Sequence, residues 1–136
     1  MPRWLAALVF TLLLTGCGGA ESQLAGTWRF VPDTSNPAPS QFAKAFDANI
    51  NMKMTIRADG TYTETTDSFQ YGSLTVPSTT AEGTWTLSNN EFTKTERTMD
   101  GAPSRSTSST ILVLSEEGDK LEGTSGTGSK LTYIKE

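Results

Sequence analysis

Short segments in which apolar and polar residues alternate dominate the chain. The clearest of them spans residues 50–57, where every second residue is apolar and its neighbours are polar or charged. A period of two is that of a β-strand with one buried face and one face in water, whereas an amphipathic helix would repeat every 3.6 residues. The apolar members of this segment are Ile50, Met52, Met54 and Ile56.

Similar segments recur about every ten residues and are separated by turn residues such as Ala58-Asp59-Gly60 and Asp100-Gly101. This spacing is typical of an antiparallel meander. We therefore expect an all-β domain in which the meander closes into a small barrel of eight or nine strands. An open β-sandwich or half-barrel is the alternative. The expected strands are residues 26–31, 50–57, 61–67, 69–76, 83–87, 91–99, 110–114, 120–125 and 131–134.

One helix is expected near residues 40–49. Ser40 can cap its first turn, and Phe42, Phe46 and Ile50 recur at the spacing of one helix face. Only 35% of the chain is hydrophobic, and a core this lean suits a sheet with one wet face better than a helical bundle.

The N-terminus has the layout of an export signal. Arg3 precedes an apolar run from Trp4 to Leu14, and Leu14-Thr15-Gly16-Cys17 closes the segment. The run, about eleven residues long, is too short to span a membrane, which takes roughly twenty. The closing tetrad resembles the bacterial lipobox, which implies cleavage before Cys17 and a diacylglyceryl group on its thiol. An ordinary signal followed by an incidental cysteine is the alternative.

We accordingly divide the chain into a cleaved lipoprotein signal peptide, residues 1–16, a lipidated cysteine with a short tether, residues 17–23, and one domain, residues 24–136. Two or three acyl chains give stable attachment to a membrane. By resemblance to lipoprotein sorting, Gly18 after the cysteine indicates the outer membrane of a two-membrane bacterium. The expected location is thus the cell envelope.

The start of the domain carries a family resemblance. Leu24-Ala25-Gly26-Thr27-Trp28-Arg29-Phe30-Val31 is similar to the opening strand of the calycins, the group of lipocalins and fatty-acid-binding proteins, and residues 58–62 are similar to their later turns. The resemblance implies a lipocalin-like barrel. Two features depart from it. The last strand offers Lys130 and Lys135 but no arginine to cover Trp28, and residues 131–133 read Leu-Thr-Tyr where an Arg-x-Tyr would hold a fatty-acid carboxylate.

Residues for common catalysis are missing. The chain has no histidine, and its single cysteine is assigned to lipid, so histidine-based triads and His/Cys metal sites are excluded. No glycine-rich loop precedes a helix, as a phosphate site would require. We expect no catalytic residue, no metal and no cofactor. The net charge of −4, without basic clusters, argues against nucleic acid. The carboxylates on strands, among them Glu64, Glu82 and Glu96, are expected on the solvated face.

An apolar set is expected inside the barrel. Its members either line a ligand pocket or simply fill the core, because an eight-stranded barrel holds little more than its own side chains. Phe42 and Phe46 are candidates for a lid over the mouth, or for a plug. The candidate pocket residues are Trp28, Phe30, Met52, Met54, Ile56, Tyr62, Trp85 and Tyr133.

The leading functional hypothesis is a non-enzymatic lipoprotein that is attached to a membrane through Cys17 and binds a small hydrophobic ligand. The alternative is a structural or assembly lipoprotein that binds an envelope protein through its sheet surface. A hydrolase that works with carboxylates alone is the third hypothesis, and it would need two acidic side chains in one cleft.

The lipid assignment predicts a measurable mass. The mature protein should begin at Cys17 and weigh more than its amino acids by the mass of its acyl groups. Cys17→Ser should lack this mass and leave the detergent phase on phase separation, whereas the tether variant Ser22→Ala should behave like the unchanged protein. An unmodified thiol on the mature wild-type chain would contradict the assignment.

Overall fold

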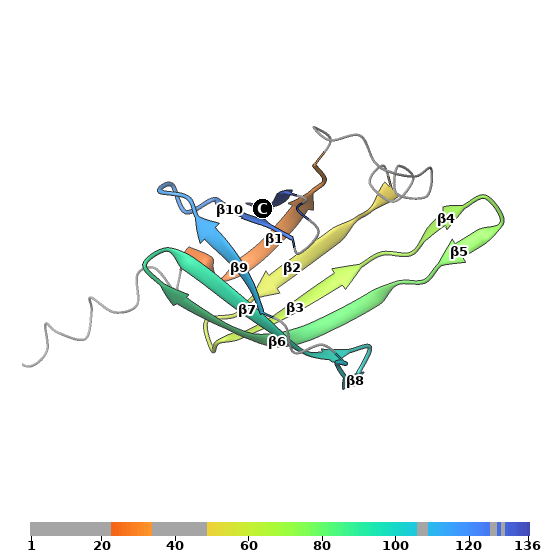
Figure 1. Ribbon diagram of the computed structural model, residues 1–136, viewed down its shortest axis with the longest axis horizontal. Helices are drawn as coiled ribbons and strands as arrows, with labels where there is room; N and C mark the ends of the chain where they lie inside the picture. The colour runs from red at the N-terminus through yellow and green to blue at the C-terminus, as the bar shows by residue number, and fades with distance from the viewer. Residues whose placement is uncertain (1–22, 34–48, 106–108, 126–127, 129) are drawn as a thin grey trace, which may run out of the picture.

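The computed structural model describes residues 23–33, 49–105, 109–125, 128 and 130–136. These form an all-β, antiparallel structure (Figure 1). The expected helix near residues 40–49, like Phe42 and Phe46, falls almost wholly outside the described residues. The strands are β1 (Gly26–Val31), β2 (Met52–Ile56), β3 (Thr61–Thr66), β4 (Phe69–Tyr71), β5 (Leu74–Val76), β6 (Thr79–Ser88), β7 (Glu91–Met99), β8 (Ala102–Pro103), β9 (Ser109–Leu114), β10 (Lys120–Thr124) and β11 (Lys130–Lys135).

Eight of these strands close into a barrel. The order is β6-β3-β2-β1-β11-β10-β9-β7, and β7 pairs again with β6. Each strand therefore lies beside its neighbour in the meander, and β1 joins β11 antiparallel with Trp28 opposite Lys135 and Val31 opposite Thr132. The expectation of a small closed meander barrel is confirmed. Closure leaves none of the eight strands as a free edge within the barrel.

Two hairpins extend the barrel. The expectation of one strand over residues 69–76 was wrong, because Gly72, with a φ of 62°, reverses the chain between β4 and β5. These strands continue β3 and β6 as an arm that projects from the barrel in Figure 1. The second extension is β8, which pairs with the end of β7 across Asp100-Gly101. Both of these turn residues have positive φ, as a two-residue hairpin of this kind requires.

The barrel has two distinct ends. We call the end where β1 begins, beside Leu24, the proximal end, and the end where β1 finishes at Val31 the distal end. The turns between β2 and β3, between β6 and β7 and between β9 and β10 lie at the proximal end, because Gly26 pairs with Ile56 and Leu114 hydrogen-bonds to Asn90. The loop connecting β1 to β2 leaves from the distal end.

Inward side chains follow the alternation that the sequence predicts. On β2, Met54 and Ile56 are buried while Lys53 and Thr55 are exposed. The same alternation on the other strands assembles one continuous apolar core. Its buried members are Leu24, Trp28, Met54, Ile56, Tyr62, Trp85, Phe92, Leu112, Leu114, Leu121 and Tyr133.

Lys135 covers the Trp28 ring, where an arginine of the last strand would lie in a lipocalin. The Lys135 ammonium lies 5.9 Å from the centre of the Trp28 ring and donates a hydrogen bond to the Gln23 carbonyl. The Trp28 indole N–H in turn donates to the Leu24 carbonyl at 2.9 Å. The missing arginine is thus replaced by a cation–π contact of the same kind, and the proximal end is covered.

Gly83 is required where β6 lies unusually close to β7 in the barrel wall. The pairing with β7 shifts register between Glu82 and Gly83, and a Cβ on Gly83 would stand 2.0 Å from the Thr95 carbonyl oxygen and 2.9 Å from a Tyr62 ring carbon. Backbone atoms cannot yield that much space. We therefore expect the close approach of β6 and β7 to depend on glycine.

Gly83→Ala should lower the free energy of unfolding by about 2 kcal/mol through overpacking. Chemical denaturation monitored by tryptophan fluorescence measures the loss. The control is Thr84→Ser, which alters the exposed neighbour on the same strand and should change stability by less than about 0.5 kcal/mol. Equal stabilities for the two variants would show that the strands separate easily at this point.

Candidate functional site

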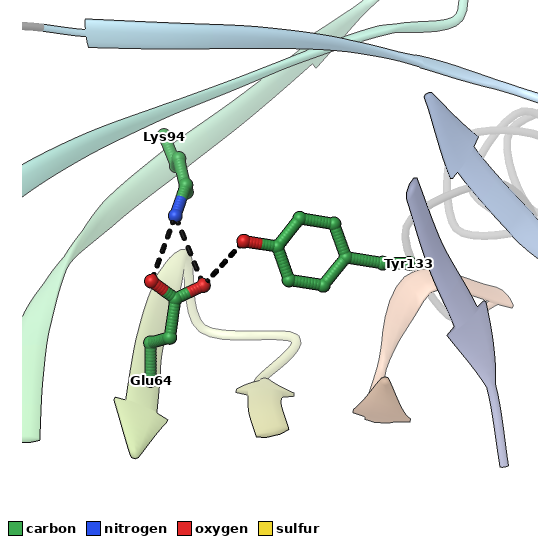
Figure 2. Close-up of polar contacts among 3 residues, drawn as sticks. All are labelled: Glu64, Lys94 and Tyr133. Carbon is green, nitrogen blue, oxygen red and sulfur yellow. Dashed lines mark hydrogen bonds and ion pairs between the residues drawn. The ribbon is translucent and has the colours of Figure 1, made fainter. Parts of the chain in front are cut away.

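Three polar side chains meet inside the barrel from strands that are far apart in sequence. Glu64 comes from β3, Lys94 from β7 and Tyr133 from β11, and Figure 2 shows them directed toward one another. Glu64 and Lys94 lie on the inward faces of their strands, because each is two residues from a buried aromatic, Tyr62 and Phe92 respectively. Tyr133 is itself buried, and Leu131, two residues before it, is partly buried. We call these three residues the interior triad.

Glu64 is the centre of the interior triad. The Lys94 ammonium donates to both of its carboxylate oxygens, at 3.1 Å and 3.0 Å. The Tyr133 hydroxyl donates to one of the same oxygens at 2.7 Å. Because a carboxylate that accepts several hydrogen bonds is well compensated for lost water, the ion pair can exist away from solvent.

The triad is nearly enclosed. The side chains of Lys94 and Glu64 are only 11% and 13% exposed. The Lys94 ammonium also lies 5.5 Å from the centre of the Tyr62 ring and 5.7 Å from that of Tyr133. Two aromatic faces and one carboxylate therefore hold this cation. The other described ion pairs, Lys53–Glu136 and Lys120–Glu122, lie on the outer surface.

The interior tyrosines are held in the neutral form. Burial, followed by the negative charge of Glu64, raises the pKa of Tyr133 far above its usual value. The pKa of Tyr62 is raised by burial first and then by the charges of Glu64 and Glu96. Both groups are consequently phenols with a proton to donate at any physiological pH.

A small hollow adjoins the triad. Its volume is about 90 Å³, and Tyr62, Lys94, Glu96 and Thr110 line it. Glu96 and Lys94 are successive inward positions of β7, and Thr110 faces Lys94 from the adjacent strand β9. The Ser104 hydroxyl, just beyond β8, donates to Glu96. The hollow is thus polar, partly open and nearer the distal end than the apolar core.

Two larger hollows lie on the outer face of the barrel. One, of about 530 Å³, is bordered by the outward residues Val113, Glu122 and Lys130. The other, of about 510 Å³, is bordered by Arg57, Glu82 and Arg97, among others. Both are open toward solvent. The first is a surface depression over the strands, whereas the second also reaches the inward residues Tyr62 and Gly83.

The structure places all eight candidate pocket residues in the interior. Phe30 and Met52 are partly buried, at the edge of the core. The others are at most 6% exposed, and Trp28 and Met54 have no exposed surface at all. A side chain without exposed surface touches no space that a water molecule could occupy, so these two act as packing. Tyr62 reaches the polar hollow, and the ligand role of the set stays a prediction.

The sequence analysis missed the charged interior. Glu64 and Glu96 were expected on the solvated face, and this expectation was wrong for both. The period of two contained the signal: Glu64 follows Tyr62 by two residues, and Lys94 and Glu96 continue the face that begins at Phe92. Glu64 and Glu96 were assigned to the outer face because they are charged, although the alternation of their strands placed them inward. Glu82, by contrast, is exposed on β6 as expected.

In the part of the chain that the structure describes, no group of three or more histidine, cysteine, aspartate or glutamate residues could hold a metal ion. No helix among the same residues is long and apolar enough to cross a membrane. Cys17, Phe42 and Phe46 lie outside the described residues, so their roles stay predictions.

Comparison with known proteins agrees with the architecture. A family model described as a lipocalin-like domain matches residues 24–123, which is most of the chain. The match covers β1 to β9 and most of β10, and it includes Glu64, Lys94, Glu96 and Thr110. No curated protein and no solved structure matches the chain.

The triad predicts an asymmetric response to substitution. Lys94→Met should reduce the free energy of unfolding by about 3 kcal/mol, because it leaves the Glu64 carboxylate enclosed without its cation. The double variant Glu64→Gln/Lys94→Met should recover a large part of this loss. Lys53→Met, which breaks the exposed pair with Glu136, is the control and should cost less than about 1 kcal/mol. Equal losses for Lys94→Met and Lys53→Met would contradict an enclosed ion pair.

The tyrosines predict how stability depends on pH. Two of the three tyrosines in the chain have a folded-state pKa above the unfolded value of about 10. Their contribution to stability is complete below that pH and is lost as pH rises toward the folded values. The tyrosinate absorbance of the native protein at pH about 11 should therefore fall short of that of the unfolded chain by two residues. A full native signal would show that both rings are accessible.

Proposed function

Because the chain belongs to the family of lipocalin-like domains, we propose that it is an envelope lipoprotein whose barrel binds a small molecule through the polar hollow beside the interior triad. Eight-stranded barrels of this type can hold one small ligand inside. The proposal includes attachment of the mature chain to the outer membrane through acyl groups on Cys17. It includes no chemical reaction.

The interior triad is the observation that supports binding. An ion pair inside a protein stabilises it little, and apolar residues of similar volume are often as good or better. A barrel whose interior served stability alone would gain nothing from Glu64, Lys94 and Tyr133. Polar groups that converge beside an accessible hollow are instead characteristic of ligand sites.

The size of the hollow restricts the ligand. The volume of about 90 Å³ is well below the roughly 300 Å³ at which pockets for drug-sized ligands begin, so the hollow accommodates only a small group. The bound molecule is therefore either very small or inserts only its polar end. In the second case the rest of the molecule would extend toward the distal end, where Phe30 and Met52 are partly buried. The fully buried aromatics at the proximal end close the other direction.

The absence of a reaction is supported by the composition. The chain contains no histidine, and its only cysteine is the proposed lipid attachment site. Glu64, the carboxylate of the triad, already accepts hydrogen bonds from Lys94 and Tyr133. A group whose lone pairs are committed in this way is poorly placed to act as a general base. A binding role uses the same groups without that conflict.

Membrane attachment is supported by the first residues of the chain. Leu14-Thr15-Gly16-Cys17 ends an apolar run that is too short to span a membrane. Cys17 has no second cysteine with which to form a disulfide. Acylation accounts for an unpaired cysteine in an exported protein, and it gives stable attachment when two or more chains are present.

Filling the hollow tests the binding role. Thr110→Phe should weaken binding of a co-purified molecule, or of a displaceable fluorescent dye, by at least about tenfold, because the added ring occupies the space that the ligand needs. Thr86→Phe adds the same ring on the outer face of β6, where Thr86 is exposed, and should leave affinity unchanged. Native mass spectrometry of protein purified from envelopes and a dye titration provide the two measurements.

Equal binding by the two phenylalanine variants would show that the ligand does not bind in the hollow. If nothing co-purified and no dye bound the wild-type protein, the ligand role would fail. The outer face would then be the better candidate, because Ile111 and Val113 are each 53% exposed beside the larger surface hollow. That outcome would favour an envelope protein partner.

A further inference from the structure

Glu96 differs from every other charged group of the barrel interior. It lines the hollow from the inward face of β7. Among the described residues, the Ser104 hydroxyl donates a hydrogen bond to one of the two carboxylate oxygens of Glu96. No described lysine or arginine forms an ion pair with it. Its second oxygen is therefore available to a molecule in the hollow.

The charges around the hollow do not cancel. Lys94 is the cation on its wall, and both oxygens of Glu64 already hold that ammonium. With the Lys94–Glu64 pair neutral as a unit, Glu96 leaves an excess of one negative charge. The negative potential of Glu96 also reaches Tyr62, another residue that lines the hollow, because the pKa of Tyr62 is raised by burial and then by the charges of Glu64 and Glu96.

We propose that the hollow selects molecules with a positively charged nitrogen, a primary or methylated ammonium group, which pairs with the free oxygen of Glu96. This inference rests on the proposed binding function and adds the chemical class of the ligand. An ammonium restores charge balance in the hollow and can also donate to the Thr110 hydroxyl. A carboxylate would face the uncompensated Glu96, since the Lys94 ammonium is engaged.

Enclosure makes this selection effective. Charges interact more strongly in a site with few water molecules than on the protein surface, and hydrogen bonds between charged groups are roughly twice as strong as neutral ones. The small volume adds a steric condition, because it admits an ammonium with few substituents. An alkyl chain on the nitrogen would lie toward the distal end. The favoured ligand is thus a short amine or the amino end of a longer molecule.

Three probes of nearly equal shape test the selection. Butylammonium, 1-butanol and butanoate differ mainly in the charge of one end, and each can be titrated into the full protein in lipid nanodiscs and followed by ligand-observed NMR. We expect butylammonium to bind at least about tenfold more tightly than 1-butanol, and butanoate to bind most weakly. Glu96→Gln, which keeps the shape of the side chain, should make butylammonium and 1-butanol bind equally.

The control is Glu91→Gln, which removes the same charge from an exposed position on the same strand and should preserve the preference for butylammonium. A preference lost equally in both variants would overturn the inference, because net charge would then explain it. Equal binding of the three probes to the wild-type protein, or tighter binding of butanoate, would also overturn it while leaving the proposed binding function intact. If no probe bound and the dye and co-purification tests also failed, the binding function itself would fall.

Discussion

The pairing of β1 with β11 holds the whole structure together. It joins the first strand of the domain to the last, with Phe30 opposite Tyr133, and thereby converts a meander into a closed cylinder. Without it, the sheet would expose the edges of β1 and β11 and open its core to water. The same pairing brings Lys135 over Trp28 and carries Tyr133 to within hydrogen-bonding distance of Glu64.

Closure of the barrel also limits the space that is left for a ligand beside the packed side chains. A cylinder of eight strands encloses little more space than its side chains need, and here aromatic and leucine residues fill the proximal part. Glu64 and Lys94 lie at the limit of this filled region, where Tyr133 and Tyr62 supply a hydroxyl and two ring faces. The polar hollow begins where apolar packing ends. The barrel therefore has room for a small polar group, and the identity of that group depends on the charges of β7.

The sequence predicted the fold better than the site, for a physical reason. Alternation along residues 50–57 and the turn residues at 58–60 and 100–101 are local signals, and each correctly located a strand or hairpin. The division of residues 69–76 into two strands depends on a single glycine with positive φ, which gives a weaker signal. The interior triad is a non-local property, because Glu64 and Tyr133 are 69 residues apart in sequence and meet only after closure.

The prediction was wrong for Glu64 and Glu96 because both are charged. A glutamate on a strand is exposed more often than not, so Glu64 and Glu96 were assigned outward against the period of their own strands. The free-energy cost of enclosing them is offset within the barrel, by Lys94 and Tyr133 for Glu64 and in part by Ser104 for Glu96. None of these partners is adjacent in sequence. Where a charged residue occupies an inward position, the alternation is the better guide to its direction, and the charge is a guide to function.

The two ends of the barrel give the proposed anchor a direction. Leu24 is buried at the proximal end, and the tether that joins it to Cys17 spans about 20 Å at most. The acyl chains would therefore lie on the proximal side, which Trp28, Lys135 and the turn residues cover. The distal end, to which the hollow with Glu96 lies nearer, would face away from the lipid surface. A ligand would then enter from the aqueous phase, and a charged amine is soluble there while an uncharged lipid is not. The proposed orientation of the barrel and the charge of the hollow thus favour the same class of ligand.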